Sequence, residues 1–216
     1  MNLSSKRFVL LSLATAALAG SLSACVPLVV GGGFASGVMV AADRRTSGAQ
    51  LEDQGIEMRA SSRLKEGLGE GSRVSVTSYN RQVLLTGEVA RTEDIQRAEQ
   101  IAARVENVNS VVNDLVVGLP ATLTQRSTDA LITSKVKASL IDAKDLQANA
   151  FKVTTERNVV YLMGRVTPRE ANRATEIARG VKDVAKVVRV FETLTEEELA
   201  RLGQTPPPPP PAQPAK

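Results

Sequence analysis

The stretch VLLTGEV at residues 83–89 has a counterpart, VYLMGRV, at residues 160–166. Both are apolar runs with glycine at the fifth position. Each follows a shorter run that contains β-branched residues, across a polar break at residues 79–82 in the first copy and 156–158 in the second. Two such runs joined by a polar turn are typical of a β-hairpin. The chain is therefore predicted to contain one folding unit twice.

Helical patterns flank each hairpin at matching positions. Before the hairpins, Ile56, Ala60 and Leu64 match Ile132, Val136 and Leu140, and the spacing of four residues puts each trio on one helical face. After them, Ala98, Ile101, Val105 and Val108 match Ala174, Ile177, Val181 and Val184, and a closing strand contains Val111 and Val112 in one copy and Val187 and Val188 in the other. Each unit thus has the order helix, strand, strand, helix, strand.

This order predicts an α+β fold. The second strand, the late helix and the third strand form a crossover, so strands two and three should be parallel and right-handed, beside an antiparallel first strand. We expect a three-stranded mixed sheet with two helices on one face in each unit. Because each unit is near the small end for independent folding, we also expect the two units to pack on each other.

Local signals mark the ends of several elements. Thr167, Pro168 and Glu170 have the spacing of a capping box with proline at the first helical position. We expect Thr92 to cap the late helix of the first unit, and Thr128 or Asp129 to cap the early helix of the second. The strand glycines Gly87 and Gly164 are interpreted as points of close backbone packing, where a helix crosses the sheet, rather than as ligand sites.

The first 24 residues are predicted to be a secretory signal. Lys6 and Arg7 precede an apolar run, residues 8–20, that is too short to span a bilayer. The run ends in Leu22-Ser23-Ala24-Cys25, which resembles the bacterial lipobox. That resemblance implies that Cys25 carries a diacylglyceryl thioether and, after cleavage, an acyl group such as palmitate on its amine. Three acyl chains would attach the protein almost permanently.

The segments outside the repeats set the domain boundaries. We expect a signal peptide at 1–24, a lipidated N-terminus and flexible linker at 25–50, the first repeat at 51–118, a linker at 119–126, the second repeat at 127–194, and a short helix with a proline-rich disordered tail at 195–216. The uncharged residues 26–42 favour an apolar leash, although Gly33 and Gly37 also have the spacing of a membrane helix contact. A polyproline tail would suit a spacer or a proline-binding partner.

Composition excludes several kinds of chemistry. The 216 residues contain no His, one Cys and 3% aromatic residues. Without His there is no Ser-His-Asp or Cys-His hydrolase, and neither imidazole nor a free thiol is left for a metal site. Few aromatic residues argue against base stacking, and no groove-reading motif is present. We expect no enzyme, no cofactor, no metal and no nucleic-acid partner.

Three segments carry a resemblance to a known family. They are ADRRTSGAQ at residues 42–50, VTTE at residues 153–156 and LMGRVTPREA at residues 162–171. Together with the duplicated unit and the lipobox, they resemble the dual BON-domain outer-membrane lipoproteins associated with cell division and outer-membrane stress. The resemblance covers Cys25 to about Glu192 and implies tandem BON domains, phospholipid association, maintenance of the envelope barrier and no enzymatic reaction. The second mature residue is Val26 and not the aspartate that retains such lipoproteins in the inner membrane. The resemblance therefore implies that the protein is located at the periplasmic face of the outer membrane. The proline tail departs from the family.

The two repeats differ in net charge. Residues 51–115 carry 8 basic and 11 acidic side chains, whereas residues 127–192 carry 12 basic and 8 acidic ones. An anionic bilayer attracts basic residues, so the second repeat is the predicted membrane-facing module. On its early helix, Leu131, Lys135 and Lys137 lie beside the core face and combine an apolar tip with two ammonium groups, although such lysines can also simply solvate a helix. The resemblance, which implies lipid contact by the second repeat, favours binding.

Two functional hypotheses follow. In the first, a lipoprotein anchored through Cys25 binds anionic phospholipid through Leu131, Lys135 and Lys137. In the second, the protein is a periplasmic adaptor for an envelope complex such as the outer-membrane protein assembly machinery, and lipid serves only as its anchor. A chain without its anchor should bind anionic vesicles in a salt-sensitive manner under the first hypothesis and ignore them under the second.

Overall fold

The computed structural model describes residues 43–202, all of which lie in one of the two units into which the chain divides, residues 39–216. The predicted signal peptide, Cys25, the leash up to residue 42 and the proline tail from residue 203 lie outside the described residues. No helix among residues 43–202 is both long enough and apolar enough to cross a membrane.

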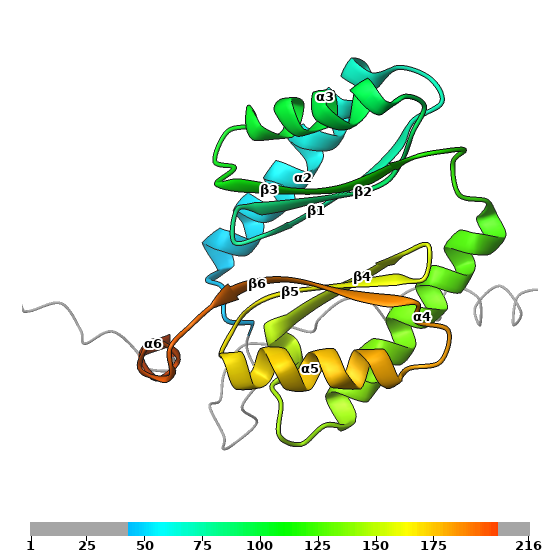
Figure 1. The fold of residues 1–216 in the computed structure, drawn as a ribbon. Coiled ribbons are helices and arrows are strands. Elements are labelled where there is room, and N and C mark those ends of the chain that lie inside the picture. Colours follow the sequence, from blue (N-terminus) through cyan, green and yellow to red (C-terminus); the bar gives the residue numbers. More distant parts are fainter. Residues whose placement is uncertain (1–42, 203–216) are drawn as a thin grey trace, which may run out of the picture. The chain divides into compact units, whose positions relative to one another are not determined.

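Each repeat has the element order that the sequence predicts (Figure 1). The first repeat contains α2 (Ser47–Leu68), β1 (Arg73–Tyr79), β2 (Gln82–Val89), α3 (Thr92–Ala103) and β3 (Ser110–Val117). The second contains α4 (Leu123–Asp142), the short 3-10 helix η2 (Ala148–Ala150), β4 (Phe151–Glu156), β5 (Val159–Val166), α5 (Pro168–Gly180) and β6 (Lys186–Thr193), and α6 (Glu196–Leu202) follows it.

The two sheets confirm the expected topology. In each, the hairpin strands are antiparallel, the middle strand is parallel to the last one, and the order is β1-β2-β3 or β4-β5-β6. The hairpins turn through two residues with positive φ, Asn80 and Arg81 in the first repeat and Arg157 and Asn158 in the second. Two-residue turns of this kind match the twist of the strands that they join. The α+β prediction is confirmed.

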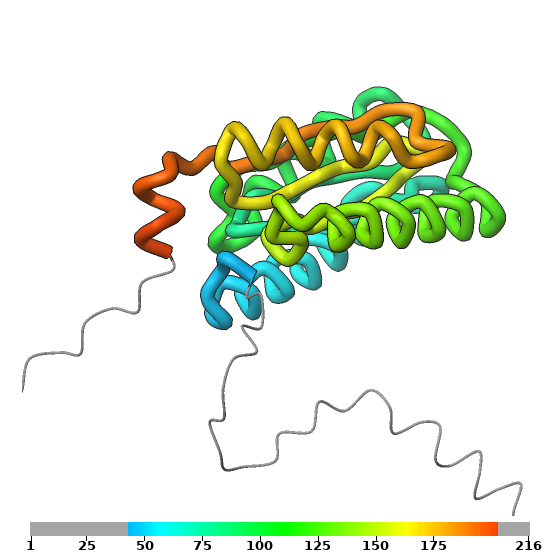
Figure 2. Tube along the Cα trace, turned by 90° about the horizontal axis from the view of Figure 1, so that it is seen from below, coloured from blue at the N-terminus to red at the C-terminus, as the bar shows by residue number. Residues whose placement is uncertain are grey.

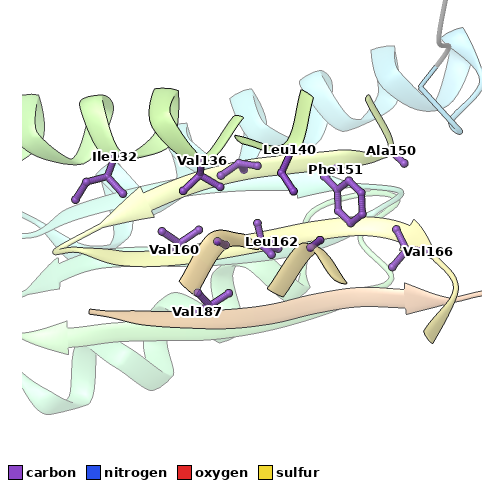
Figure 3. Packing of buried hydrophobic residues seen from close by; sticks show 12 residues of the cluster. Ile132, Val136, Leu140, Ala150, Phe151, Val160, Leu162, Val166 and Val187 are labelled. Atoms are coloured by element: carbon purple, nitrogen blue, oxygen red, sulfur yellow. The ribbon is translucent and has the colours of Figure 1, made fainter. Parts of the chain in front are cut away.

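Both helices of a repeat cover the same face of its sheet and enclose a core there (Figure 1). Figure 3 shows how α4 and strands β4, β5 and β6 contribute side chains to the second core. The buried residues of that core are Ile132, Val136, Leu140, Ala150, Phe151, Val153, Val160, Leu162, Val166, Ala174, Ala178 and Val187. The helix trios that the sequence analysis aligned are buried in both repeats. α4 and α5 lie side by side (Figure 2).

A third buried cluster uses the opposite faces of the sheets. It contains Tyr79 and Leu84 from the first repeat and Tyr161, Met163 and Val190 from the second. Successive residues of a strand point to opposite faces, so the middle strands β2 and β5 are buried on both sides. The two repeats therefore share buried apolar surface.

The strand glycines meet backbone atoms of β1 and of Ala150, the last residue of η2, and not an α-helix that crosses the sheet. A Cβ at Gly87, whose φ is 114°, would lie 2.1 Å from the carbonyl oxygen of Arg73, and one at Gly164 would lie 2.4 Å from that of Ala150. Both distances are below any real Cβ contact. The expected close backbone packing is confirmed, but the expected helix crossing is wrong, because the close atoms belong to β1 and to the residue before β4.

Two of the expected helix starts are wrong. The early helix of the second repeat begins at Leu123, where Thr122 and Gln125 form a reciprocal capping box, and not at Thr128 or Asp129. In the first repeat, Thr92 is the first residue of α3, and no side chain caps that helix. The capping box of Thr167 and Glu170, by contrast, is confirmed.

Candidate functional site

The exposed side of α4 is the candidate site. Ile132, Val136 and Leu140 face the core and are at most 1% exposed. At 3.6 residues per turn, the opposite side of the helix is formed by Leu123, Ser127, Ala130, Leu131, Ser134, Ala138 and Ile141. We call these seven residues the α4 outer face. All are exposed and none is acidic.

The apolar tips of the α4 outer face are large and open to solvent. Leu123 is 76% exposed, Leu131 62% and Ile141 69%. The two serines add little polarity, because the Oγ of Ser127 donates to the carbonyl of Leu123 and the Oγ of Ser134 donates to that of Ala130, each at 2.9 Å. Hydroxyl groups bonded back to their own helix leave a surface that an apolar phase can accept. Of the two acidic residues of the helix, Asp129 is buried, whereas Asp142, the last residue, is exposed at the C-terminal end of this side of the helix, one turn beyond Ala138.

Three cations border the α4 outer face. Arg126 and Lys137 lie along one edge and Lys135 along the other, as their spacing on the helix requires. Arg126 and Lys137 are exposed and form no ion pair with any residue between 43 and 202. The ammonium of Lys135 lies 3.5 Å from a carboxylate oxygen of Asp183, and both side chains are about half exposed. An ion pair this exposed to water is weak, so Lys135 as well as Arg126 and Lys137 can bind an anion.

A hollow adjoins the C-terminal half of the helix. It has a volume of about 370 Å³, and Lys137 and Ile141 line it together with apolar side chains such as Leu140 and Phe151 and with the acidic residue Asp43. The three predicted site residues are all exposed on α4. Leu131 belongs to the α4 outer face, and Lys135 and Lys137 lie along its opposite edges.

Sequence reasoning missed Leu123, Arg126 and Ile141. The first two were assigned to the linker because the helix was expected to begin later. The signal that could have placed them is the spacing from Thr122 to Gln125, which is that of a capping box. Ile141 could have been found from helical periodicity, since it lies on the same face as Ser134 and Ala138.

The matching surface of the first repeat is different. The sequence counterpart of Lys135 is Arg59, which pairs with Glu52 at 2.7 Å and with Glu106 at 3.5 Å. Leu51 and Met58 are exposed on α2, at 70% and 71%, and Lys65 lies on the same side without an ion pair to a described residue. However, Arg63 also binds Glu106, and the helix carries acidic side chains at Glu52 and Glu66. An anionic surface would therefore be attracted to α4 more strongly than to α2.

The described part of the chain contains no candidate metal centre. Residues 43–202 contain no group of three or more metal-ligating side chains. The predicted lipidation site, Cys25, lies outside that range and is not tested by the geometry.

Comparison with known proteins identifies the family. The BON domain matches residues 52–118 and 128–194. The outer membrane lipoprotein DolP of Haemophilus influenzae is 37% identical over 176 residues, which cover 80% of this chain and 90% of that protein. The chain belongs to the dual BON-domain outer-membrane lipoproteins.

The chain is also similar to other proteins. The 21 kDa hemolysin of Actinobacillus pleuropneumoniae is 34% identical over 151 residues, which cover 69% of this chain and 78% of that protein. The solved structure of CdsD, a structural protein of the type III secretion system of Chlamydia trachomatis, covers 71% of this chain and 96% of that one at 13% identity, with a TM-score of 0.29.

The BON match also locates what this chain adds around the domain. The second match begins at residue 128, so the first turn of α4, with Leu123 and Arg126, precedes it. Arg44 and Arg45 likewise precede the first match, which begins at residue 52. Part of the α4 outer face thus lies before the matched domain.

Proposed function

We propose that this outer-membrane lipoprotein is non-enzymatic, is anchored through Cys25 at the periplasmic face, and binds anionic phospholipid through the α4 outer face, in support of the envelope barrier. The observation that carries the proposal is an exposed apolar helix face that meets an acidic side chain only at its C-terminal end, bordered by three cations that have no strong partner among the described residues. A headgroup layer accepts this combination, with apolar tips at the acyl boundary and cations at the phosphates.

The energies favour a reversible contact. Near an anionic leaflet each basic residue contributes about 1 kcal/mol, so Arg126, Lys135 and Lys137 together contribute about 3 kcal/mol at low salt. Partial burial of Leu131 and Ile141 adds a term of similar size. Binding of this strength is weak on its own. An acylated Cys25 would hold the helix near the bilayer and make the contact persistent.

The proposal predicts that the chain without its anchor binds anionic vesicles in a salt-sensitive manner. A chain that starts at Asp43 keeps all three buried clusters. In flotation assays it should rise with vesicles that contain phosphatidylglycerol and stay behind with purely zwitterionic ones. Raising the salt from about 0.05 M to about 0.5 M should release it, because screening weakens attraction between exposed charges. Equal binding to both kinds of vesicle, or to neither, would contradict the proposal.

A second candidate function is the periplasmic adaptor for an outer-membrane protein assembly complex. Leu51 and Met58 favour it, since they are 70% and 71% exposed on α2 of the acidic repeat, where an anionic membrane is not attracted. Under this alternative, replacing both Leu51 and Met58 with serine abolishes the co-purification of an envelope protein and leaves vesicle flotation unchanged.

A further inference from the structure

The segment between the repeats exposes large apolar side chains. Leu119 is 89% exposed, and Leu123, the first residue of α4, is 76% exposed. Val117, at the end of β3, is 50% exposed. Between residues 115 and 128 the chain contains no acidic residue and a single cation, Arg126. We call Leu119 and Leu123 the linker leucines.

The backbone around Leu119 is fixed to the first repeat. On one side, the amide of Gly118 donates to the carbonyl of Val89 at 3.1 Å. On the other, the amide of Ala121 donates to Glu88 Oε2 at 3.0 Å. Leu119 is therefore held between two anchored positions.

The carboxylate that holds Ala121 is itself fixed. Glu88 is fully buried and also accepts hydrogen bonds from the guanidinium groups of Arg73, at 3.2 Å, and Arg157, at 3.4 Å. Arg73 in turn pairs with Glu156 of the second repeat. The linker is thus hydrogen-bonded to a cluster of charged side chains that come from both repeats. The backbone that exposes Leu119 is therefore ordered before any partner binds. Preorganisation lowers the entropy that ordering costs when a surface binds.

Leu123 connects the linker to the α4 outer face. It lies eighteen residues, or five helical turns, before Ile141, so the two side chains share one side of the helix. Arg126, one turn further on, supplies a cation beside it. Apolar tips and a cation without nearby acid are the chemistry of the α4 outer face, continued toward the linker.

We propose that the linker leucines extend the membrane contact of the α4 outer face, to which Leu123 already belongs, so that Leu119 inserts into the same anionic phospholipid surface. This inference rests on the proposed function and extends its site beyond the matched BON domain. The occupant is a lipid surface, because the linker leucines continue the α4 outer face at its N-terminal end, away from Asp142, and that face is bordered by cations.

Paired substitutions test the proposal. Leu119→Ser with Leu123→Ser should weaken binding of the chain from Asp43 to phosphatidylglycerol vesicles by about tenfold, since each leucine loses its apolar contact. Leu51→Ser with Met58→Ser removes equally exposed apolar groups from α2 and should leave binding unchanged. All four side chains are largely exposed, so the fold should tolerate both variants. Unchanged binding in the linker variant, or equal losses in the two variants, would overturn the proposal.

A positional probe separates this inference from the proposed function. The chain from Asp43 contains no cysteine, because Cys25 is the only one in the sequence. An environment-sensitive dye on Leu119→Cys should shift to the blue with phosphatidylglycerol vesicles, as should a dye on Ser134→Cys in the α4 outer face. A shift at residue 134 without one at residue 119 would overturn the linker contact alone. Absence of both shifts, with no flotation of the unlabelled chain, would overturn the proposed function as well.

Discussion

Alanine in place of Arg44 is expected to lower the free energy of unfolding by about 3–5 kcal/mol. The guanidinium of Arg44 donates to both carboxylate oxygens of Glu170, at 2.7 and 2.8 Å, and to the carbonyl of Arg165 at 2.7 Å. The two side chains of the pair are only 6% and 4% exposed. Removing one partner of a buried ion pair leaves an uncompensated charge, which is why the effect is large. Residue 44 precedes α2, so the second repeat depends on a side chain from the opposite end of the chain.

Chemical denaturation of the Arg44→Ala chain measures this effect. The matched control is Arg173→Ala, which breaks a pair with Asp145 at 3.0 Å whose side chains are about half exposed. An exposed pair contributes less than about 1 kcal/mol. If the two variants lost equal stability, Arg44 would not act as a buried partner.

The cost of losing Arg44 should also depend on pH. Burial favours the neutral form of Glu170, but hydrogen bonds from Arg44 and the amide of Thr167 outweigh it and hold the pKa of this carboxyl below its ordinary value. A depressed pKa in the folded state contributes stability above the unfolded pKa of about 4.3, and this contribution is lost as the pH falls through the folded pKa. The difference in stability between the parent chain and the Arg44→Ala variant should be complete at neutral pH and shrink below about pH 4.

Alanine in place of Asp53 is expected to cost about 3–5 kcal/mol. The carboxylate of this buried residue accepts hydrogen bonds from the amides of Asn80 and Arg81 in the β1–β2 turn, at 2.7 and 2.8 Å. It also accepts from Ser78 Oγ and pairs with Arg45, both at 2.7 Å. The substitution would leave two turn amides and the Ser78 hydroxyl without their acceptor, and Arg45 would keep only Asp43 as a carboxylate partner.

The equivalent residue in the second repeat provides a graded comparison. Asp129 accepts from the amides of Arg157 and Asn158, each at 2.9 Å, and forms no ion pair with a described residue. Asp129→Ala should therefore cost less, about 2–3 kcal/mol, because no buried cation loses a partner. Urea unfolding of both variants checks the order. A larger loss for Asp129→Ala than for Asp53→Ala would contradict this interpretation of the two aspartates.

The repeated fold could be predicted from the sequence because its signals are local. Hydrophobic spacing placed Ile56 and Ile132 in equivalent helices, and the capping box at Thr167 marked the start of α5. The roles of Asp53 and Asp129 could not be predicted in this way. Their partners in the hairpin turns lie 27 to 29 residues away, and only the folded chain brings helix and turn together.

The candidate site could be predicted only in part. The charge count identified the more basic repeat, and helical periodicity predicted that Leu131, Lys135 and Lys137 are exposed on its early helix. Which cations remain unpaired depends on distant residues. Arg59 resembles Lys135 in the sequence, yet it pairs with Glu52 at 2.7 Å and also with Glu106, 47 residues along the chain, whereas Lys135 has only Asp183 at 3.5 Å among the described residues. Such pairings follow from tertiary contacts that a linear pattern does not contain.

Charge reversal on α4 tests the central claim most directly. The variant Lys135→Glu with Lys137→Glu, in the chain from Asp43, is compared with Arg97→Glu and Arg104→Glu, which change the net charge equally on the first repeat. Those two arginines are exposed and form no ion pair with a described residue. Flotation with phosphatidylglycerol vesicles should be lost in the α4 variant and kept in the control. Retained flotation in the α4 variant, or equal loss in both, would contradict lipid binding by the α4 outer face.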